Sequence, residues 1–136
     1  MVKITGEYQG ELHCVAVHGP SGCELNTDAP KDNMGRGEAF SPTDLLATSF
    51  ATCVVTTMGI AAKKKGVELG KVRFEVTKEM SADAPRRVVR LAAQFWMPIP
   101  KSDPLAEYLE SIAHNCPVHH SLSPAVETPV VFHWAE

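Results

Sequence analysis

The sequence predicts an α+β protein folded as a single domain over residues 1–136. Its 136 residues fall within the usual size of one domain. One long helical pattern and one shorter one lie between runs of alternating, strand-like residues. The predicted strands cover 3–8, 12–18, 23–27, 70–80, 86–97 and 127–134, and the predicted helices cover 41–65 and 103–116.

Composition excludes several classes of protein. With 44% hydrophobic and 21% charged residues, the chain has the balance of an ordinary globular protein rather than a disordered one. A net charge of −3 gives no sign of a nucleic-acid partner. The apolar stretch 45–62 is interrupted by hydroxyl side chains, which argues against a membrane partner. The first ten residues, MVKITGEYQG, lack the apolar core of a signal peptide, so we expect a cytoplasmic protein with reduced thiols.

The first three predicted strands form a meander, and a segment of mixed charge follows them at 28–39. Gly35 and Gly37 surround Arg36 in this segment, and Pro30 lies near its start. We expect a loop of about 12 residues, a length that is often functional in small domains.

The first helix has clear signals at both ends. Ser41 supplies an N-cap, Pro42 suits the first turn, and Asp44 stands where a capping box has an acid. Three lysines and Gly66 mark its end. Because the helix between them is apolar or small nearly all round, we expect it to be covered by a sheet and by another subunit.

The second half continues with a hairpin through 81–85 and a helix that begins at Asp103 and Pro104. An apolar stripe at helical spacing runs along this helix as far as Cys116. We expect Pro117 to end the helix and the strand 127–134 to complete a sheet.

Four cysteines occur without a CxxC pair. Cys53, in mid-helix, is either a core thiol or a nucleophile activated by a cation or donor from another element. Cys116 is either a core residue or a resolving thiol, and a helix C-terminus there would raise its pKa. Cys14 and Cys23, in the meander, are expected to be structural.

A cluster of possible zinc ligands surrounds Cys116, although its spacing matches no standard zinc finger. Its members are His114, Cys116, His119 and His120. A zinc-linked protein therefore stays an alternative.

Two cysteine motifs resemble those of the OsmC/Ohr family, the osmotically inducible and organic hydroperoxide resistance proteins. Pro42 and Cys53 have the family's spacing between the helix-start proline and the reactive cysteine. The step Asn115-Cys116-Pro117-Val118 matches the second motif. With the order of elements, the resemblance covers essentially the whole chain.

The resemblance implies an OsmC-like fold and an interleaved homodimer with antiparallel sheets wrapped around two central helices. It also implies a thiol-dependent peroxidase that reduces organic hydroperoxides in defence against oxidative stress. In this scheme Cys53 becomes a sulfenic acid and Cys116 resolves it as a disulfide. An external dithiol reductant, lipoyl-type in the Ohr branch, restores the thiols, and no bound cofactor or metal is expected.

The chain also departs from the family's pattern. Thr43 stands where the family's peroxidases carry the glutamate that fixes an arginine, and no arginine precedes Arg36. Arg36 is therefore the expected substitute, and the chain is placed among the OsmC-like relatives rather than in the Ohr branch. The alternative is a binding or sensing protein with an unreactive Cys53. Four large apolar side chains, Phe40, Phe50, Met58 and Trp96, are either the lining of an apolar substrate pocket or core residues, and core is the more common role of such residues.

Overall fold

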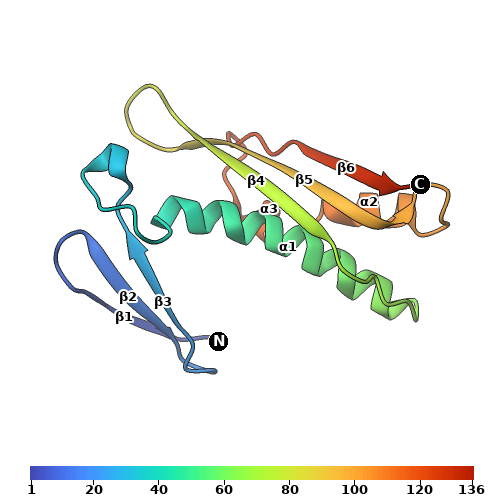
Figure 1. Cartoon of the computed structure of the whole chain (residues 1–136), viewed down its shortest axis with the longest axis horizontal. Helices are drawn as coiled ribbons and strands as arrows, with labels where there is room; N and C mark the ends of the chain where they lie inside the picture. The colour runs from blue at the N-terminus through green and yellow to red at the C-terminus, as the bar shows by residue number, and fades with distance from the viewer. The chain divides into compact units, whose positions relative to one another are not determined.

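The structure, a computed structural model, describes all residues from 1 to 136 (Figure 1). Its elements are β1 (Ile4–Tyr8), β2 (His13–His18), β3 (Glu24–Asp28), a short 3-10 helix η1 (Lys31–Asn33), α1 (Pro42–Lys64), β4 (Arg73–Met80), β5 (Val88–Pro100), α2 (Ala106–Ala113), α3 (Pro117–Ser121) and β6 (Val130–Ala135). The α+β class is confirmed. The chain divides into two compact units, Met1–Leu46 and Ala47–Glu136, and the single domain stays a prediction.

The first unit contains the predicted meander. β1 pairs antiparallel with β2, and β2 pairs antiparallel with β3, so that His13 lies opposite Asp28. The strand bounds differ by about one residue from those expected, which is normal for strand ends. All five residues of β1 are exposed.

The segment after β3 folds back tightly on itself. The Asp28 amide donates to the Phe40 carbonyl at 3.1 Å, and the Gly37 amide donates to the Ala29 carbonyl at 3.2 Å. A Cβ at Gly35 would overlap the Ala29 carbonyl oxygen. The glycine at this position therefore permits the close approach of two backbones.

Helix α1 begins and ends as its sequence predicts. The Asp44 amide donates to Ser41 Oγ at 3.0 Å, and the Ser41 amide donates to Asp44 Oδ2 at 2.9 Å. This reciprocal pair is a capping box with aspartate in place of glutamate. At the other end Gly66 has a φ of 75°, the left-handed conformation expected after a helix.

The sheet of the second unit has the order β4-β5-β6. β4 and β5 pair antiparallel, as expected for the hairpin, but β6 pairs parallel with β5. The prediction of antiparallel sheets is wrong for this one pair. The helices α2 and α3 lie between the two strands in the chain, and a crossover of that length returns the chain in the same direction.

One face of β5 is buried, and its residues are Leu91, Ala93, Phe95 and Met97. Phe95 is central, because its ring lies 6.2 Å from the ring of Phe74 on β4 and 5.8 Å from that of Phe132 on β6. On the other face Trp96 stacks on His133 and carries the Arg73 guanidinium 3.9 Å above its ring. The helices therefore pack on the Phe95 face of the sheet.

Only one face of α1 is buried within a single chain. Its buried side chains are Ala47, Phe50, Ala51, Val54, Met58, Ala61 and Ala62. Ile60, on the opposite side, is 52% exposed. By length and composition alone α1 could cross a membrane, but the core helix of a globular protein passes the same test, and the buried face assigns α1 to the core.

The region after residue 113 differs from its prediction. Pro117 does not end the second helix but begins α3, and α2 already ends at Ala113. Cys116 is extended, with φ −74° and ψ 149°, and caps α3. Proline suits the first turn of a helix as well as it stops one. Asp103 lies in a turn before α2, where its carboxylate accepts from the Leu105 amide at 2.9 Å.

Replacing Phe95 tests the core of this sheet. We expect Phe95→Ala to lower the free energy of unfolding by about 3–5 kcal/mol, because it leaves a cavity among three strands. Val131→Ala, at an exposed position of β6, is the control and should change it by about 0.5 kcal/mol or less. Urea unfolding measures both, and equal effects would contradict this assignment of the core.

Candidate functional site

The structure brings Cys53 and Cys116 together within the second unit. Cys53 lies in the middle of α1 and is partly exposed, whereas Cys116 caps α3 and is fully buried. The Cys53 thiol is a hydrogen-bonding neighbour of the Cys116 thiol. Both cysteines are reduced. Two sulfurs far apart in the sequence are thus adjacent in the fold.

Burial raises the pKa of the Cys116 thiol. The backbone amide of His119, 3.3 Å from Cys116 Sγ, opposes this change, and so does the amide of Val118. The neighbouring Cys53 raises the pKa further through its hydrogen bond and its charge. The predicted rise in the pKa of Cys116 is confirmed. Its cause is burial and not a helix C-terminus, because Cys116 stands at the start of a helix.

This asymmetry gives the two thiols different chemical roles. The raised pKa favours the protonated form of Cys116, which can donate a hydrogen bond to the Cys53 sulfur. Cys53 borders a pocket open to solvent. A thiolate is the nucleophilic form of cysteine, so Cys53 is the sulfur that an incoming molecule can meet.

The pocket at Cys53 has a volume of about 420 Å³. Its lining residues, from the open side of α1 and the start of α3, are Ser49, Thr52, Cys53, Thr56, Thr57, Ile60, Pro117 and Val118. The surface they present is mostly apolar. Thr57 Oγ1 lies 3.9 Å from Cys53 Sγ.

None of Phe40, Phe50, Met58 and Trp96 lines the Cys53 pocket. Phe50 and Met58 are buried in the core, and Phe40 is 54% exposed in the first unit. Trp96 stacks between Arg73 and His133 on the sheet. A pattern of hydrophobic residues in the sequence does not separate core side chains from those that line a pocket.

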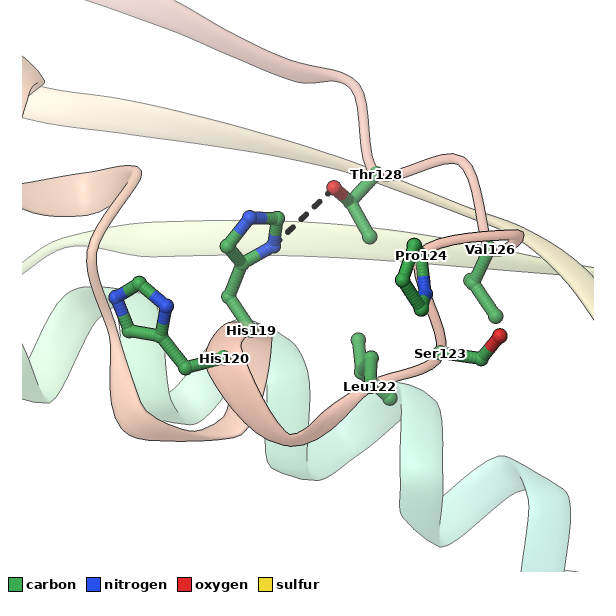
Figure 2. Close-up of a pocket in the computed structure, with 7 residues that line it drawn as sticks. All are labelled: His119, His120, Leu122, Ser123, Pro124, Val126 and Thr128. Carbon is green, nitrogen blue, oxygen red and sulfur yellow. Dashed lines mark hydrogen bonds between the residues drawn. The ribbon is translucent and has the colours of Figure 1, made fainter.

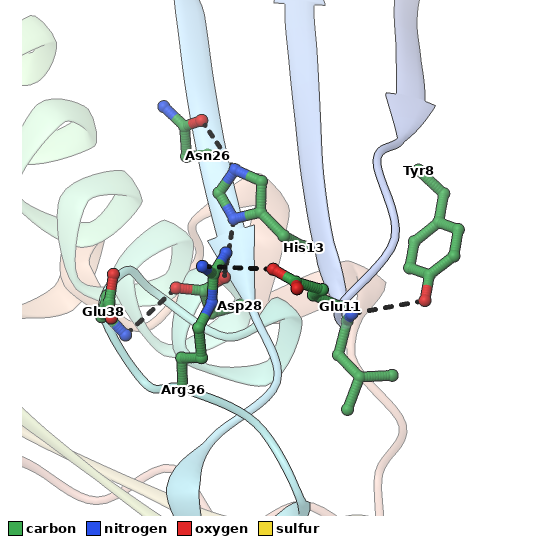
Figure 3. Close-up of polar contacts among 8 residues, drawn as sticks. Tyr8, Glu11, His13, Asn26, Asp28, Arg36 and Glu38 are labelled. Atoms are coloured by element: carbon green, nitrogen blue, oxygen red, sulfur yellow. Dashed lines mark hydrogen bonds and ion pairs between the residues drawn. The ribbon is translucent and has the colours of Figure 1, made fainter.

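Arg36 lies in the first unit, within a cluster of charged residues (Figure 3). Its guanidinium is 3.5 Å from Glu11 and 3.9 Å from Asp28. Its role beside the thiols stays a prediction.

Asp28 is the buried centre of this cluster, with 2% of its surface exposed. Its Oδ1 lies 2.6 Å from His13 Nδ1, and its Oδ2 accepts from the Glu38 amide at 3.1 Å. The hydrogen bond with His13 is the main reason why the pKa of Asp28 lies below its ordinary value of 3.8, although burial opposes the change. The carboxylate thus ties β2 to the loop that carries Arg36.

The histidines near Cys116 form a separate pocket of about 410 Å³ (Figure 2). His119 Nδ1 lies 3.3 Å from Thr128 Oγ1. His119 and His120 line this pocket with residues of the segment 122–128. No group of three or more histidine, cysteine, aspartate or glutamate side chains is arranged to hold a metal ion, so the geometry gives the zinc alternative no support.

Sequence analysis missed the hydroxyl side chains around Cys53 and the role of Asp28. Ser49, Thr56, Thr57 and Ile60 lie three, four or seven positions from Cys53, a spacing that places them on its side of the helix. That signal was present in the sequence. Asp28 gave no such signal, because its burial depends on the pairing of β3 with His13 on β2.

Fold and site together define an α+β protein whose long helix holds one thiol of an adjacent pair. The family model for OsmC-like proteins matches residues 35–130. The chain therefore belongs to the OsmC-like protein family, as the two cysteine motifs predicted.

Solved structures agree with this assignment. A protein of Psychrobacter arcticus 273-4, provisionally named an osmotic stress induced and detoxification response protein, is 42% identical, with a TM-score of 0.87 over 97% of this chain and 94% of that one. An organic hydroperoxide resistance protein OsmC of Legionella pneumophila is 17% identical, with a TM-score of 0.78 over 98% and 96%.

The organic hydroperoxide resistance protein OhrB of Bacillus subtilis is 16% identical, with a TM-score of 0.71 over 97% of each chain. At these two lower identities the likeness shows the fold alone. No curated protein sequence matches the chain.

The buried carboxylate of Asp28 should make the protein sensitive to acid. Because the pKa of folded Asp28 lies below 3.8, its stabilisation is complete above that value and is lost as the pH falls through the lower one. We expect Asp28→Asn to be less stable than wild type at pH 7, with a smaller difference at pH 3. Urea midpoints at both pH values measure this.

Glu24→Gln, an exposed carboxyl at the start of β3, is the control for Asp28→Asn. It should leave the urea midpoint unchanged at both pH values. A wild-type advantage over Asp28→Asn that is equal at pH 3 and pH 7 would contradict a role for the charge.

Proposed function

We propose that this protein is a thiol-dependent peroxidase that reduces organic hydroperoxides, with Cys53 as the peroxidatic and Cys116 as the resolving cysteine. The observation that carries the proposal is the adjacency of an accessible thiol in a largely apolar pocket and a buried thiol that keeps its proton. Membership of the OsmC-like family supports it, since related folds include organic hydroperoxide resistance proteins. Oxidative-stress defence in the cytoplasm is the setting we propose.

In the first step the Cys53 thiolate attacks one oxygen of the hydroperoxide. A sulfur–oxygen bond forms, the oxygen–oxygen bond breaks, and the leaving alkoxide takes a proton and departs as an alcohol. Cys53 is thereby oxidised by two electrons to a sulfenic acid. We assign the stabilisation of the thiolate and the leaving oxygen to Arg36.

In the second step the Cys116 sulfur attacks the sulfur of the sulfenic acid. A disulfide forms, and the hydroxyl group leaves with the Cys116 proton as water. The interaction between the two thiols supports this step, because a disulfide forms only between cysteines that lie close together. An external dithiol, lipoyl-type by analogy with the family, then reduces the disulfide to two thiols and becomes a disulfide itself.

Steady-state consumption of tert-butyl hydroperoxide with dihydrolipoamide as reductant tests the proposal. We expect Cys53→Ser to lower turnover by on the order of a thousandfold, because the nucleophile is lost. Cys116→Ser should still form a sulfenic acid in a single turnover but no Cys53–Cys116 disulfide. Mass spectrometry of the oxidised cysteines distinguishes these products.

Cys23→Ser is the matched control, since Cys23 is also a free thiol but lies exposed before β3. It should keep the wild-type rate. Equal rates in wild type and Cys53→Ser would reject the peroxidase and leave the alternative, an OsmC-like binding or sensing protein.

We also propose that the protein works as an interleaved homodimer. A three-stranded sheet whose outer strand is exposed along its whole length is a poor independent structure. Ile4 and Tyr8 on β1 are 66% and 62% exposed, and Ile60 on the open side of α1 is 52% exposed. A second copy of the chain would cover these apolar surfaces.

Light scattering at micromolar concentration tests the dimer. We expect twice the mass of one chain, and a lower average mass for Ile60→Glu, because the change places a charge on an apolar interface. Glu24→Gln should keep the dimer mass. A monomer mass for the wild-type protein would exclude the homodimer.

A further inference from the structure

We propose that the Thr57 hydroxyl is a hydrogen-bond donor to the Cys53 thiolate and so a further catalytic group of this site. The proposal rests on the proposed function, in which Cys53 is the nucleophile. It names the group on α1 itself that stabilises the reactive form of the sulfur. No charged side chain of the second unit lines the Cys53 pocket.

The position of Thr57 on α1 places its side chain beside the Cys53 sulfur. Thr57 follows Cys53 by four residues, so the two side chains lie one above the other on the same side of α1. Thr57 Oγ1 is 3.9 Å from Cys53 Sγ, and both residues line the same pocket. The separation is long for a hydrogen bond, as is common in resting sites whose contacts shorten when charge develops.

The hydroxyl of Thr57 is free for this task, unlike that of its neighbour. A threonine inside a helix usually donates to the carbonyl three or four residues earlier. Thr52 does so, with Thr48 O at 2.7 Å and Ser49 O at 3.3 Å. The Thr57 hydroxyl makes no such bond, and its hydrogen-bond partner is the Cys53 sulfur.

When Cys53 is a thiolate, the direction of this bond is fixed. Cys116, at the start of α3, is the ionisable group that interacts with Cys53, and it remains protonated because burial raises its pKa. The ring of His119, also on α3, contacts Phe50 and Thr128. A thiolate only accepts hydrogen bonds, so the thiol of Cys116 and the hydroxyl of Thr57 both donate to it.

The rate of Cys53 alkylation by iodoacetamide between pH 5 and pH 10 tests the proposal in the full chain. Peptide mass spectrometry separates Cys53 from the other three cysteines. Thr57→Val keeps the shape of the side chain and removes the donor. We expect its alkylation midpoint to move up by about one pH unit, which is about tenfold slower alkylation at a fixed lower pH.

Two further variants separate the hydroxyl from other effects. Thr57→Ser keeps the donor and should return the midpoint toward that of wild type. Thr56→Val removes a neighbouring hydroxyl that bonds no sulfur and should leave the midpoint in place. If Thr57→Val folds poorly, Thr57→Ala removes the same donor with a residue that favours helix.

An alkylation profile of Thr57→Val that overlays the wild-type profile would overturn the proposal, and so would an equal movement in Thr56→Val. The readout needs no peroxide. A protein without peroxidase activity that still shows the Thr57→Val shift would refute the proposed function and support the hydrogen bond. Peroxidase activity with no shift would do the opposite.

Discussion

The meeting of Cys53 with Cys116 is the constraint on which the rest of the site depends. It requires α1 to present its middle turn to the N-cap residue of α3, and it requires α2 to end early enough for Cys116 to become that cap. Burial of Cys116 then follows, and with it the raised pKa that keeps this thiol protonated. Within a single chain, the open side of α1 leaves Cys53 accessible. Position, protonation and accessibility are therefore set by one local arrangement of two helices.

Local signals in the sequence predicted the elements that local interactions stabilise. The capping box of Ser41 and Asp44, the glycine after α1 and the three antiparallel hairpins are determined by residues close in the chain. Pro117 was misinterpreted because proline is compatible with both the end of one helix and the start of the next. The parallel pairing of β6 with β5 was missed, although the long helical connection between them makes it the natural choice.

The candidate site was predictable only in part, because it depends on contacts between residues far apart in the chain. The two cysteines were found through their spacing to Pro42 and Pro117, a pattern that belongs to the family rather than to any single physical rule. Their adjacency depends on how a crossover packs against α1, which no local pattern determines. Phe50 and Met58 pack in the core, Phe40 and Trp96 lie elsewhere, and smaller hydroxyl side chains line the pocket. The position of Thr57 beside the Cys53 sulfur follows from the four-residue spacing of these two residues on one helix.

The separation of Cys53 and Cys116 along the chain links the redox state of the protein to its stability. The whole β4–β5 hairpin and α2 lie between them. A bond between the sulfurs would close this segment into a covalent ring and restrict the unfolded chain, an entropic effect of roughly 4 kcal/mol for a ring of this size. Oxidised molecules would then resist denaturation better than reduced ones. Each catalytic cycle would therefore pass through a disulfide form that is harder to unfold and in which Cys53 is no longer a nucleophile.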